Sequence, residues 1–334
     1  MSDIVPFGFE VPDLVEELNS LLGQIPCGRV TTYGDLADAL GSKAAARWVG
    51  ECLVDAHFCD DVPDHRVIRS TGELGLHVSR DVSVKSALLQ EEAVDVRDGK
   101  VDLDRYRVGE FESDAPLARL TAQQHALAQR ISIEPFDGEL GRIAGVDVSY
   151  IGKQRAVAAY VLMDAETSEV IWTTTIERTK MFPYISGFLT YRESPLLLEL
   201  LRIADASGQR ADVVCVDGNG ILHPRRAGIA SFIGVSANVP TIGIAKKLLC
   251  GHVDLNNMPA EEARPITDNN EIVGYALKSK SYSRPVFVSP GHRIDASDAA
   301  RIVKGLLLEH RLPEPIFLAD ALSRQVARSE AGSS

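Results

Sequence analysis

The chain has no apolar run long enough to cross a membrane, and it contains few aromatic residues and few cysteines. Aromatic side chains make up 6% of its 334 residues. A membrane-spanning helix needs about 20 consecutive apolar residues, and the N-terminus has neither a basic start nor a signal-type apolar core. We therefore expect no membrane partner and a cytoplasmic location.

The cysteines argue against a disulfide framework and against a zinc site. They occupy positions 27, 52, 59, 215 and 250, an odd number without the spacing of metal ligands. Cys52, Cys215 and Cys250 stand in apolar surroundings, which suit small buried thiols. This pattern fits a reducing compartment.

The negative charge of the chain is confined to its N-terminal part. The whole chain carries −12, and 45% apolar with 25% charged residues is typical of a globular protein with room for two domains. Residues 1–115 hold 23 acidic and 11 basic side chains, which leaves 24 of each sign in residues 116–334. The C-terminal part can therefore present a basic face to a nucleic acid.

A polar segment with Gly and Pro follows residue 107 and coincides with this change in charge. We therefore predict a first domain over residues 1–107, a linker over 108–118 and a second domain over 119–334. The last residues, 329–334, have the composition of a frayed tail.

The first domain shows helical periodicity. Apolar spacing predicts helices over residues 14–22, 33–40 and 43–53, the third capped by Ser42. The closely spaced second and third helices favour a helix-turn-helix.

The second domain follows an α/β pattern. After a helix over residues 122–131, apolar runs at 142–150, 156–163 and 170–175 predict an antiparallel meander. Alternating elements then follow, namely helices at 195–206, from 225 and at 296–309, and strands at 212–217, 240–245 and within 272–289. This order is the outline of a ribonuclease H-like mixed sheet flanked by helices.

Acidic residues interrupt apolar segments of the second domain. Asp147 and Asp217 each stand in a run that otherwise predicts a buried strand, and Glu193 follows Tyr191-Arg. A buried carboxylate is costly without a compensating partner, and hard oxygen ligands favour Mg²⁺ or Mn²⁺. Two of these residues would lie on neighbouring strands, so we expect a metal site. The alternative is that one Asp caps a helix and another fixes a turn.

Two basic side chains follow further strands. Lys246 stands where an ammonium could hold a phosphate, and His292 stands where it could serve acid–base chemistry or complete the metal shell. Each could also be an ordinary surface residue. One or two Mg²⁺ ions held by carboxylates would supply what phosphodiester hydrolysis needs.

Five ordered motifs in residues 119–330 resemble endonuclease V. They are Ala-Gly-Val-Asp147, Pro183-Tyr-Ile-Ser-Gly-Phe-Leu-Thr-Tyr-Arg-Glu193, Asp217-Gly-Asn-Gly-Ile-Leu-His-Pro, Gly243-Ile-Ala-Lys-Lys-Leu-Leu-Cys-Gly251 and Ser289-Pro-Gly-His-Arg-Ile294. The resemblance implies a Mg²⁺-dependent enzyme that recognises deoxyinosine or inosine and nicks the second phosphodiester 3′ of the lesion.

The same resemblance implies roles for individual residues. Asp147, Glu193 and Asp217 would bind metal, His292 would belong to the catalytic centre, and Lys246 and His223 would support the phosphate. Pro183, Tyr184, Ile185 and Ser186 match a strand-separating wedge, in which an aromatic ring fills the space of a rotated base. Ser186 replaces a second proline of that wedge, and Phe232 stands where many relatives have histidine.

The first domain resembles the DNA-binding domain of O6-alkylguanine-DNA alkyltransferases and alkyltransferase-like proteins over about residues 10–95. The segments that carry the resemblance begin at Ile25, Ala45 and Val62. The resemblance implies that Tyr33 helps to rotate a nucleotide and that Arg47 replaces the extruded base.

Asp64 stands at the place of the alkyl-accepting cysteine. Alkyl transfer needs a thiolate, and a carboxylate is a poor substitute. We therefore predict no alkyltransferase activity. An Asp beside a lesion pocket could instead accept a hydrogen bond from a base, and a vestigial or protein-binding role for this acidic domain also remains open.

Together these observations predict a DNA-repair endonuclease whose first domain binds DNA or senses lesions. Three alternatives remain: a nuclease for inosine-containing RNA, a non-catalytic damage sensor, and a suicidal alkyltransferase. A 2′-hydroxyl dependence, binding without cleavage, or a mass increase with alkylated DNA would identify each of them.

Overall fold

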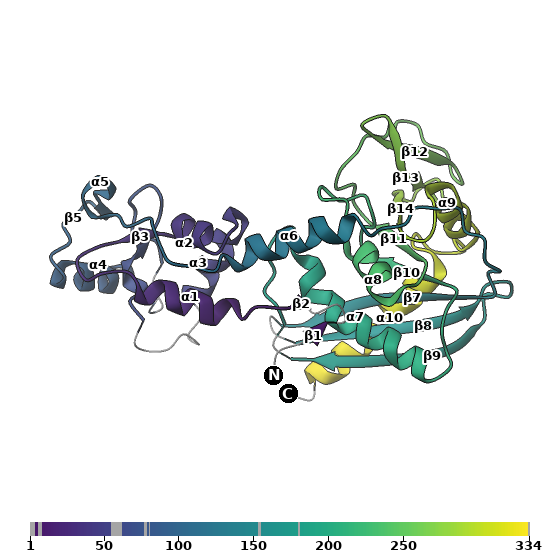
Figure 1. Cartoon of the computed structure of the whole chain (residues 1–334), viewed down its shortest axis with the longest axis horizontal. Helices are drawn as coiled ribbons and strands as arrows, with labels where there is room; N and C mark the ends of the chain where they lie inside the picture. The colour runs from purple at the N-terminus through teal and green to yellow at the C-terminus, as the bar shows by residue number, and fades with distance from the viewer. Residues whose placement is uncertain are drawn as a thin grey trace. The chain divides into compact units, whose positions relative to one another are not determined.

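The computed structural model describes residues 4–5, 9–54, 62–76, 79, 81–152, 155–179 and 181–332. Cys59 lies outside these residues. The chain forms two compact units, one of residues 1–11, 123–181 and 190–334 and the other of residues 12–122 and 182–189 (Figure 1). No helix in the described part of the chain is long and apolar enough to cross a membrane.

The second unit is mainly helical. Its elements are α1 (Leu14–Gly23), β3 (Thr31–Thr32), α2 (Tyr33–Ala39), η1 (Lys43–Ala45), α3 (Ala46–Val54), η2 (Asp64–Arg66), β4 (Val67–Ile68), α4 (Val82–Glu91), β5 (Val96–Arg97), β6 (Lys100–Val101) and α5 (Leu103–Tyr106). Strands β3 and β4 pair in parallel, and β5 and β6 pair antiparallel. Buried side chains such as Val30, Ile68 and Leu89 form a core of this unit.

The predicted helix pair of this unit is confirmed, with one correction. Asp35 and Thr32 form a capping box at the start of α2. The next helix begins with the 3₁₀ turn η1, and the Ser42 side chain makes no capping hydrogen bond there. Ser42 thus occupies the predicted N-cap position, where its backbone carbonyl accepts from the Ala45 N–H, but its side chain does not cap the turn.

The first unit contains an eight-stranded mixed sheet in the order β12-β13-β14-β11-β10-β7-β8-β9. The strands are β7 (Arg142–Ile151), β8 (Arg155–Asp164), β9 (Val170–Arg178), β10 (Val213–Asp217), β11 (Thr241–Ala245), β12 (Ala263–Asp268), β13 (Glu271–Leu277) and β14 (Val286–His292). The predicted meander of β7, β8 and β9 is confirmed, and β10 lies parallel to β7. A short antiparallel pair, β1 (Ile4–Val5) and β2 (Phe9–Glu10), also belongs to this unit.

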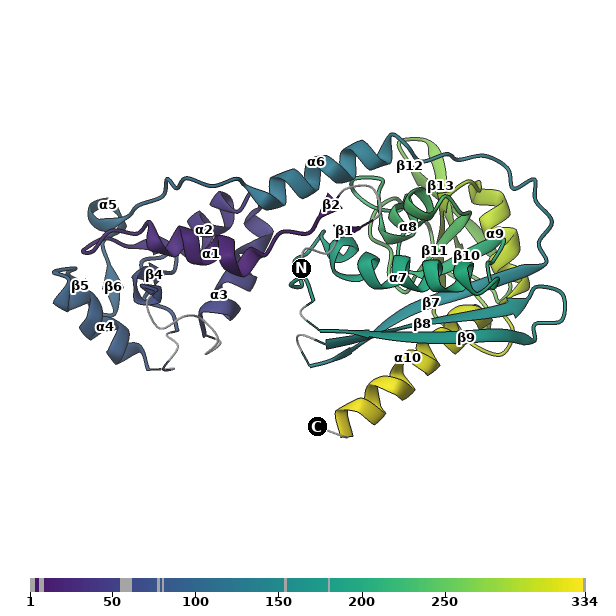
Figure 2. The ribbon, with the colours of Figure 1, turned by 60° about the horizontal axis from the view of Figure 1, so that its bottom comes forward.

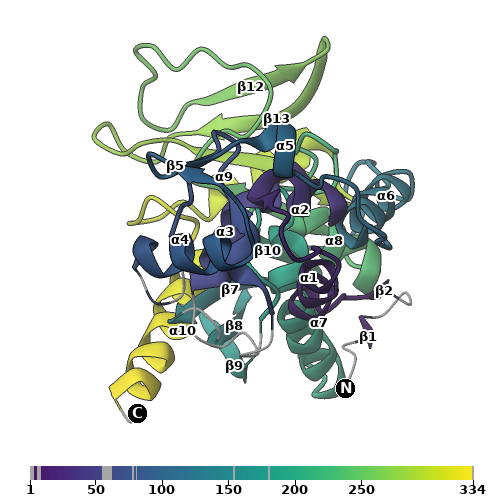
Figure 3. The same cartoon turned by 90° about the vertical axis from the view of Figure 1, so that its left-hand side faces the viewer.

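Strand β12 was not predicted. It forms a hairpin with β13 at the edge of the sheet (Figure 3). Pro265 lies within it. An edge strand tolerates proline because the missing N–H faces no neighbour, whereas the same proline weakens the strand pattern in the sequence.

Helices cover both faces of this sheet (Figure 2). They are α7 (Leu189–Ala206) and α8 (Ile229–Ala237) on one face and α9 (Ala296–Gly305) and α10 (Glu314–Gly332) on the other. Buried residues of α9 and α10, including Val303 and Ile316, pack on Ile143, Cys215 and Ile244 of the strands. The mixed α/β architecture with a helix-flanked sheet is therefore confirmed.

Several helices differ from the sequence prediction. Helix α6 (Pro116–Ala128) begins within the predicted linker, and α7 begins at Leu189 rather than near the predicted residue 195. Proline favours a first turn, but here Pro195 lies inside the helix. Helix α10 was not predicted, and the expected frayed tail was wrong for residues 329–332, which are helical.

Candidate metal centre and nucleic-acid contacts

Three aspartates of the first unit lie together at one place on the sheet. Ligand oxygens of Asp147, Asp217 and Asp320 all lie within 4.8 Å of one another. Asp147 belongs to β7, Asp217 ends β10 and Asp320 belongs to α10. The structure therefore brings two of the predicted carboxylates together and adds a third that the sequence analysis missed.

Alternate side chains of β7 face α10, and a glycine among them lets the helix come close. Side chains two residues apart share a face, so Ile143, Gly145 and Asp147 all point toward α10. A Cβ at Gly145 would lie 2.1 Å from the carbonyl oxygen of Pro315, so glycine is required for the close approach of α10 to β7. Asp320 follows Pro315 by little more than one turn, which carries its carboxylate to Asp147.

Asp147 is buried among other acidic groups. Burial and the charges of Asp217 and Asp320 together raise the pKa of Asp147 to about 7, against the opposing hydrogen bond from Ser323. The Ser323 hydroxyl donates to Asp147 Oδ2 at 2.8 Å. Crowded carboxylates repel one another, so a cation in their midst would stabilise their charged forms.

Glu193 approaches from the other side of the sheet. It lies in the first turns of α7 and is 8% exposed. The Tyr150 hydroxyl donates to Glu193 Oε1 at 2.6 Å. Burial and the charges of Asp147 and Asp217 together raise the pKa of Glu193 to about 7, against the effect of the Tyr150 hydrogen bond. Glu193 thus interacts electrostatically with the aspartates, although it is not part of their 4.8 Å group among the described residues.

Lys246 lies directly beside the aspartates. It follows β11, and its Nζ donates to Asp217 Oδ2 at 2.6 Å. Burial lowers the pKa of Lys246, but the charges of Asp217 and its neighbours outweigh this and raise it. The ammonium therefore stays charged and close to any phosphate that reaches Asp217.

His292 lies away from the aspartates, contrary to the expectation that it completes the metal shell. It pairs with Thr241 at the start of β11, whereas Asp217 pairs with Ile244 near the end of that strand. Its Nδ1 accepts a 3.1 Å hydrogen bond from the Ser132 N–H. The expectation failed because β14 runs antiparallel to β11. The last residue of β14, His292, therefore lies at the opposite ends of the strands from Asp217.

His223 lies in the loop between β10 and α8. Burial and the charge of Arg225 lower the pKa of His223 to about 4, so the ring is neutral at pH 7. The Arg225 N–H donates to its Nδ1 at 3.2 Å. The ring proton therefore resides on Nε2, which is available as a hydrogen-bond donor.

The wedge residues alternate between solvent and protein. Tyr184 is 68% exposed, whereas Ile185 is 2% exposed. Ser186 is exposed and Pro183 is half-buried. An exposed aromatic ring on a segment anchored by a buried isoleucine can enter a base stack without exposing the protein core.

In the second unit, Tyr33 begins α2 and Arg47 lies on α3. The Tyr33 hydroxyl donates to the Leu76 carbonyl at 3.4 Å. Arg47 is exposed, and its Nε donates to Glu51 Oε1 at 2.9 Å. Such an exposed ion pair contributes little to stability, so the Arg47 guanidinium can exchange Glu51 for a nucleic-acid partner.

Asp64 lies in η2 near a buried lysine. The Lys85 ammonium donates to the carbonyls of Val67 and Leu76 at 2.5 and 3.2 Å. Burial lowers the pKa of Lys85 to about 8, against the opposing charge of Asp64. Asp64 also raises the pKa of Tyr33, after the larger effect of burial. Asp64, Tyr33 and Lys85 therefore share one electrostatic environment.

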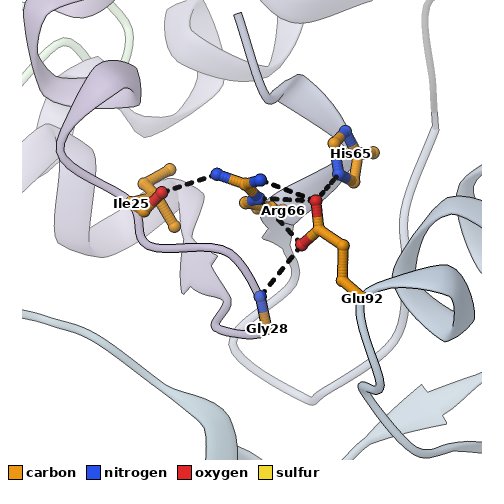
Figure 4. A network of polar contacts seen from close by, with 5 residues as sticks. All are labelled: Ile25, Gly28, His65, Arg66 and Glu92. Carbon is orange, nitrogen blue, oxygen red and sulfur yellow. Dashed lines mark hydrogen bonds and ion pairs between the residues drawn. The ribbon is translucent and has the colours of Figure 1, made fainter.

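The residues after Asp64 form a network around Glu92 (Figure 4). His65 Nε2 lies 2.9 Å from Glu92 Oε1, and the Arg66 guanidinium donates to both Glu92 oxygens at 2.6 to 3.0 Å. Arg66 also donates to the Ile25 carbonyl at 2.7 Å, and the Gly28 N–H donates to Glu92 at 3.1 Å. This network ties η2 to the segment before β3.

Comparisons with known proteins match both units. The family model of endonuclease V matches residues 125–321, and the model of the 6-O-methylguanine DNA methyltransferase DNA-binding domain matches residues 14–94. The resemblances seen in the sequence motifs are thereby confirmed.

Individual relatives extend these matches. A bifunctional methyltransferase/endonuclease of Picrophilus torridus is 37% identical over 312 residues, which cover 92% of this chain and 94% of that protein. An endonuclease V of Methanopyrus kandleri is 40% identical over 224 residues, which cover 67% of this chain and 94% of that protein. The Ciona intestinalis endonuclease V, solved with a 24mer DNA containing an inosine followed by a ribo-adenosine, superposes with a TM-score of 0.60 at 30% identity and covers 65% of this chain and 99% of its own.

Proposed function

The chain belongs to the endonuclease V family, and on this premise we propose that it nicks DNA at the second phosphodiester 3′ of a deaminated adenine. It is a DNA-repair endonuclease with a DNA-binding N-terminal domain. The grouping of Asp147, Asp217 and Asp320 within 4.8 Å of one another is the single observation that best supports this activity.

The three aspartates fit a divalent cation. Their oxygens are the hard ligands that Mg²⁺ prefers, and we propose Mg²⁺ as the cofactor, with Mn²⁺ able to replace it. When bound, the metal would activate water and stabilise charge on the phosphate. Ser323 orients Asp147 through its 2.8 Å hydrogen bond, as hydrogen bonds around metal ligands commonly do.

Other residues of this unit would position the phosphate. Lys246 would neutralise a phosphate oxygen after it exchanges its bond to Asp217, and neutral His223 would donate from Nε2. Glu193 uses one oxygen for Tyr150, so its other oxygen can orient water or complete the metal shell. His292 is not among these residues, because it lies at the opposite ends of the strands from Asp217.

The segment from Pro183 to Ser186 would separate the strands at the lesion. Tyr184 supplies the exposed ring that replaces a rotated base, and buried Ile185 holds the segment in place. A single proline, Pro183, stiffens this wedge, since Ser186 leaves its far end unrestrained.

For the N-terminal domain we propose lesion sensing without alkyl transfer. Tyr33 and Arg47 would act on the rotated nucleotide, and Asp64 would accept a hydrogen bond from a base. Although the Picrophilus relative is called a methyltransferase/endonuclease, Asp64 provides no thiolate here. We propose bounds of 1–107 and 119–334 for the two domains, with a linker over 108–118 of which α6 occupies the last residues.

A second substrate has one observation in its favour. The Ciona relative was solved with an inosine followed by a ribonucleotide, so cleavage of inosine-containing RNA is the alternative activity. The metal would act in the same way on a DNA or an RNA phosphodiester, so contacts to the 2′-hydroxyl would decide which substrate is preferred.

The test is cleavage of a labelled duplex that carries one deoxyinosine, with Mg²⁺ or with EDTA. We expect a Mg²⁺-dependent nick at the second phosphodiester 3′ of the lesion. A matched oligonucleotide with a ribonucleotide after the inosine measures the RNA alternative. Lesion binding without cleavage of either substrate would make the protein a damage sensor and refute the proposal.

A further inference from the structure

A loop with basic residues and an exposed tyrosine belongs to the same unit as the aspartates. It covers residues 278–285, connects β13 to β14 and contains Lys280, Tyr282 and Arg284. Tyr282 is 81% exposed, so most of its ring faces solvent. The face of this ring is therefore accessible to a stacking partner.

Sheet register places the loop at the same ends of the strands as the predicted phosphate site. Val288 of β14 pairs with Ile244 of β11, and Ile244 pairs with Asp217 of β10. Adjacent strands therefore bring together the end of β10, Lys246 after β11 and the start of β14. Neighbouring strands are about 4.8 Å apart, so the start of β14 lies about 10 Å from β10.

Arg311 joins the loop to the segment of Lys246. Its guanidinium donates to the carbonyls of Arg284 and Pro285 at 3.1 and 3.0 Å. It also donates to the Lys246 carbonyl at 2.9 Å. Because Lys246 in turn contacts Asp217, the end of the loop is held in a defined position relative to the aspartates.

Lys280 and Arg284 of the loop differ in how freely they could contact a phosphate. Lys280 pairs with Glu309 at 3.0 Å, so its charge is partly compensated. Arg284 is exposed, and Lys247 is exposed next to Lys246. A phosphate backbone that crosses Lys246 would therefore meet further positive charge at Arg284.

We propose that residues 278–285 bind one flank of the cleaved strand, with a base stacked on Tyr282 and a phosphate at Arg284. The inference rests on the proposed function, because the strand must also reach the aspartates. Stacking on a side chain requires an unpaired base, so the bound flank is single-stranded there. Because Arg311 ties the end of the loop to the Lys246 segment, and Lys246 contacts Asp217, this contact would lie a few nucleotides from the scissile phosphate.

The first experiment measures binding without cleavage. The full chain and its variants are titrated in EDTA with an undamaged, fluorescently labelled single-stranded oligonucleotide. Tyr282→Ala should weaken binding by about 5- to 100-fold, as loss of one base–aromatic stack does. Tyr282→Phe keeps the ring and should bind like the wild type. Equal binding by Tyr282→Ala and wild type, or equal loss in both variants, would overturn the proposal.

Arg284→Gln tests the phosphate contact. It should lower the slope of log Kd against log salt by about 0.7, the value for one phosphate on a single strand. Lys304→Gln is the matched control, because Lys304 is an exposed cation on α9, which covers a face of the sheet. The same slope change in both variants would refute a specific contact at Arg284.

The position of the contact is tested with deoxyinosine substrates shortened from either end. Tyr282→Ala should raise KM and leave kcat unchanged, and the effect should vanish when the flank that reaches Tyr282 is removed. An effect that persists after both flanks are shortened would refute the placement. If no inosine substrate is cleaved, the proposed function fails, whereas the binding experiment still decides the role of the loop.

Discussion

Ser323 and Asp147 are joined by a 2.8 Å hydrogen bond across 176 positions of the sequence. The same hydroxyl lies 2.8 Å from that of Ser149 and 3.1 Å from the carbonyl of Asp320. One side chain of α10 thus connects the central strand to the helix that supplies the third aspartate. The geometry of the candidate metal centre therefore depends on how α10 packs.

Removal of one carboxylate charge should slow nicking strongly. Asp147→Asn, Asp217→Asn and Asp320→Asn each remove a ligand charge worth several kcal/mol to the transition state, so kcat should fall by about 10²- to 10³-fold. Single-turnover cleavage of the deoxyinosine duplex measures this loss. Lesion binding should persist. Asp205→Asn, at an exposed position late in α7, is the control, and full activity in any of the three variants would remove that residue from the site.

Loss of the Ser323 hydroxyl should weaken metal binding rather than chemistry. Ser323→Ala leaves Asp147 without its orienting donor, and loss of such a partner raises the metal concentration for half-maximal activity by about 10- to 100-fold. Titration of cleavage with Mg²⁺ gives this value. Saturating Mg²⁺ should restore most of kcat, and an unchanged Mg²⁺ requirement would show that Ser323 does not position Asp147.

The wedge should control selectivity. Tyr184→Ala removes the exposed ring that would fill the stack at the lesion, so discrimination between deoxyinosine and normal duplexes should fall by about 10-fold or more. Cleavage at saturating substrate should slow less. Competition between labelled lesion duplex and unlabelled normal duplex measures the ratio. Tyr184→Phe should retain it, and equal discrimination by Tyr184→Ala and wild type would contradict a wedge role.

Glu92 should stabilise its unit at neutral pH. Burial raises the pKa of Glu92, but hydrogen bonds from Arg66, His65 and Gly28 outweigh this and lower it from 4.5 to about 2. A depressed folded-state pKa contributes stability above the unfolded value, and this stability is lost as the pH falls from 4.5 through about 2.

Glu92→Gln should therefore speed hydrogen exchange at Gly28 and around His65 at pH 7. The difference from wild type should narrow as the pH falls from 4.5 toward about 2. Hydrogen exchange of the full chain followed by mass spectrometry resolves these segments. A difference that grows toward low pH would have the wrong sign for this linkage.

Incubation with DNA that carries O6-methylguanine should leave the mass of the protein unchanged. Asp64 offers a carboxylate in place of the thiolate that accepts an alkyl group. Intact-mass spectrometry of the full chain after incubation provides the measurement. Addition of one methyl group would show that another nucleophile accepts it, and peptide mapping would identify that residue.

Much of this protein was determined by local sequence patterns. Apolar runs predicted β7, β8 and β9, and the runs before Asp217 and Lys246 predicted β10 and β11. Such patterns are short-range, because a strand needs only alternating or continuous apolar residues to bury its faces. The motifs around Asp147 and Asp217 also indicated the family that the comparisons confirm.

Only the tertiary structure decided the composition of the site. Asp320 belongs to a helix that the sequence pattern did not reveal, so its carboxylate could not be placed beside Asp147. His292 stands in a family motif, yet the antiparallel direction of β14 places it at the opposite ends of the strands from Asp217. The His65–Glu92 pair was likewise missed, since its members lie 27 positions apart. Local periodicity specifies elements, whereas strand direction and helix packing specify which side chains meet.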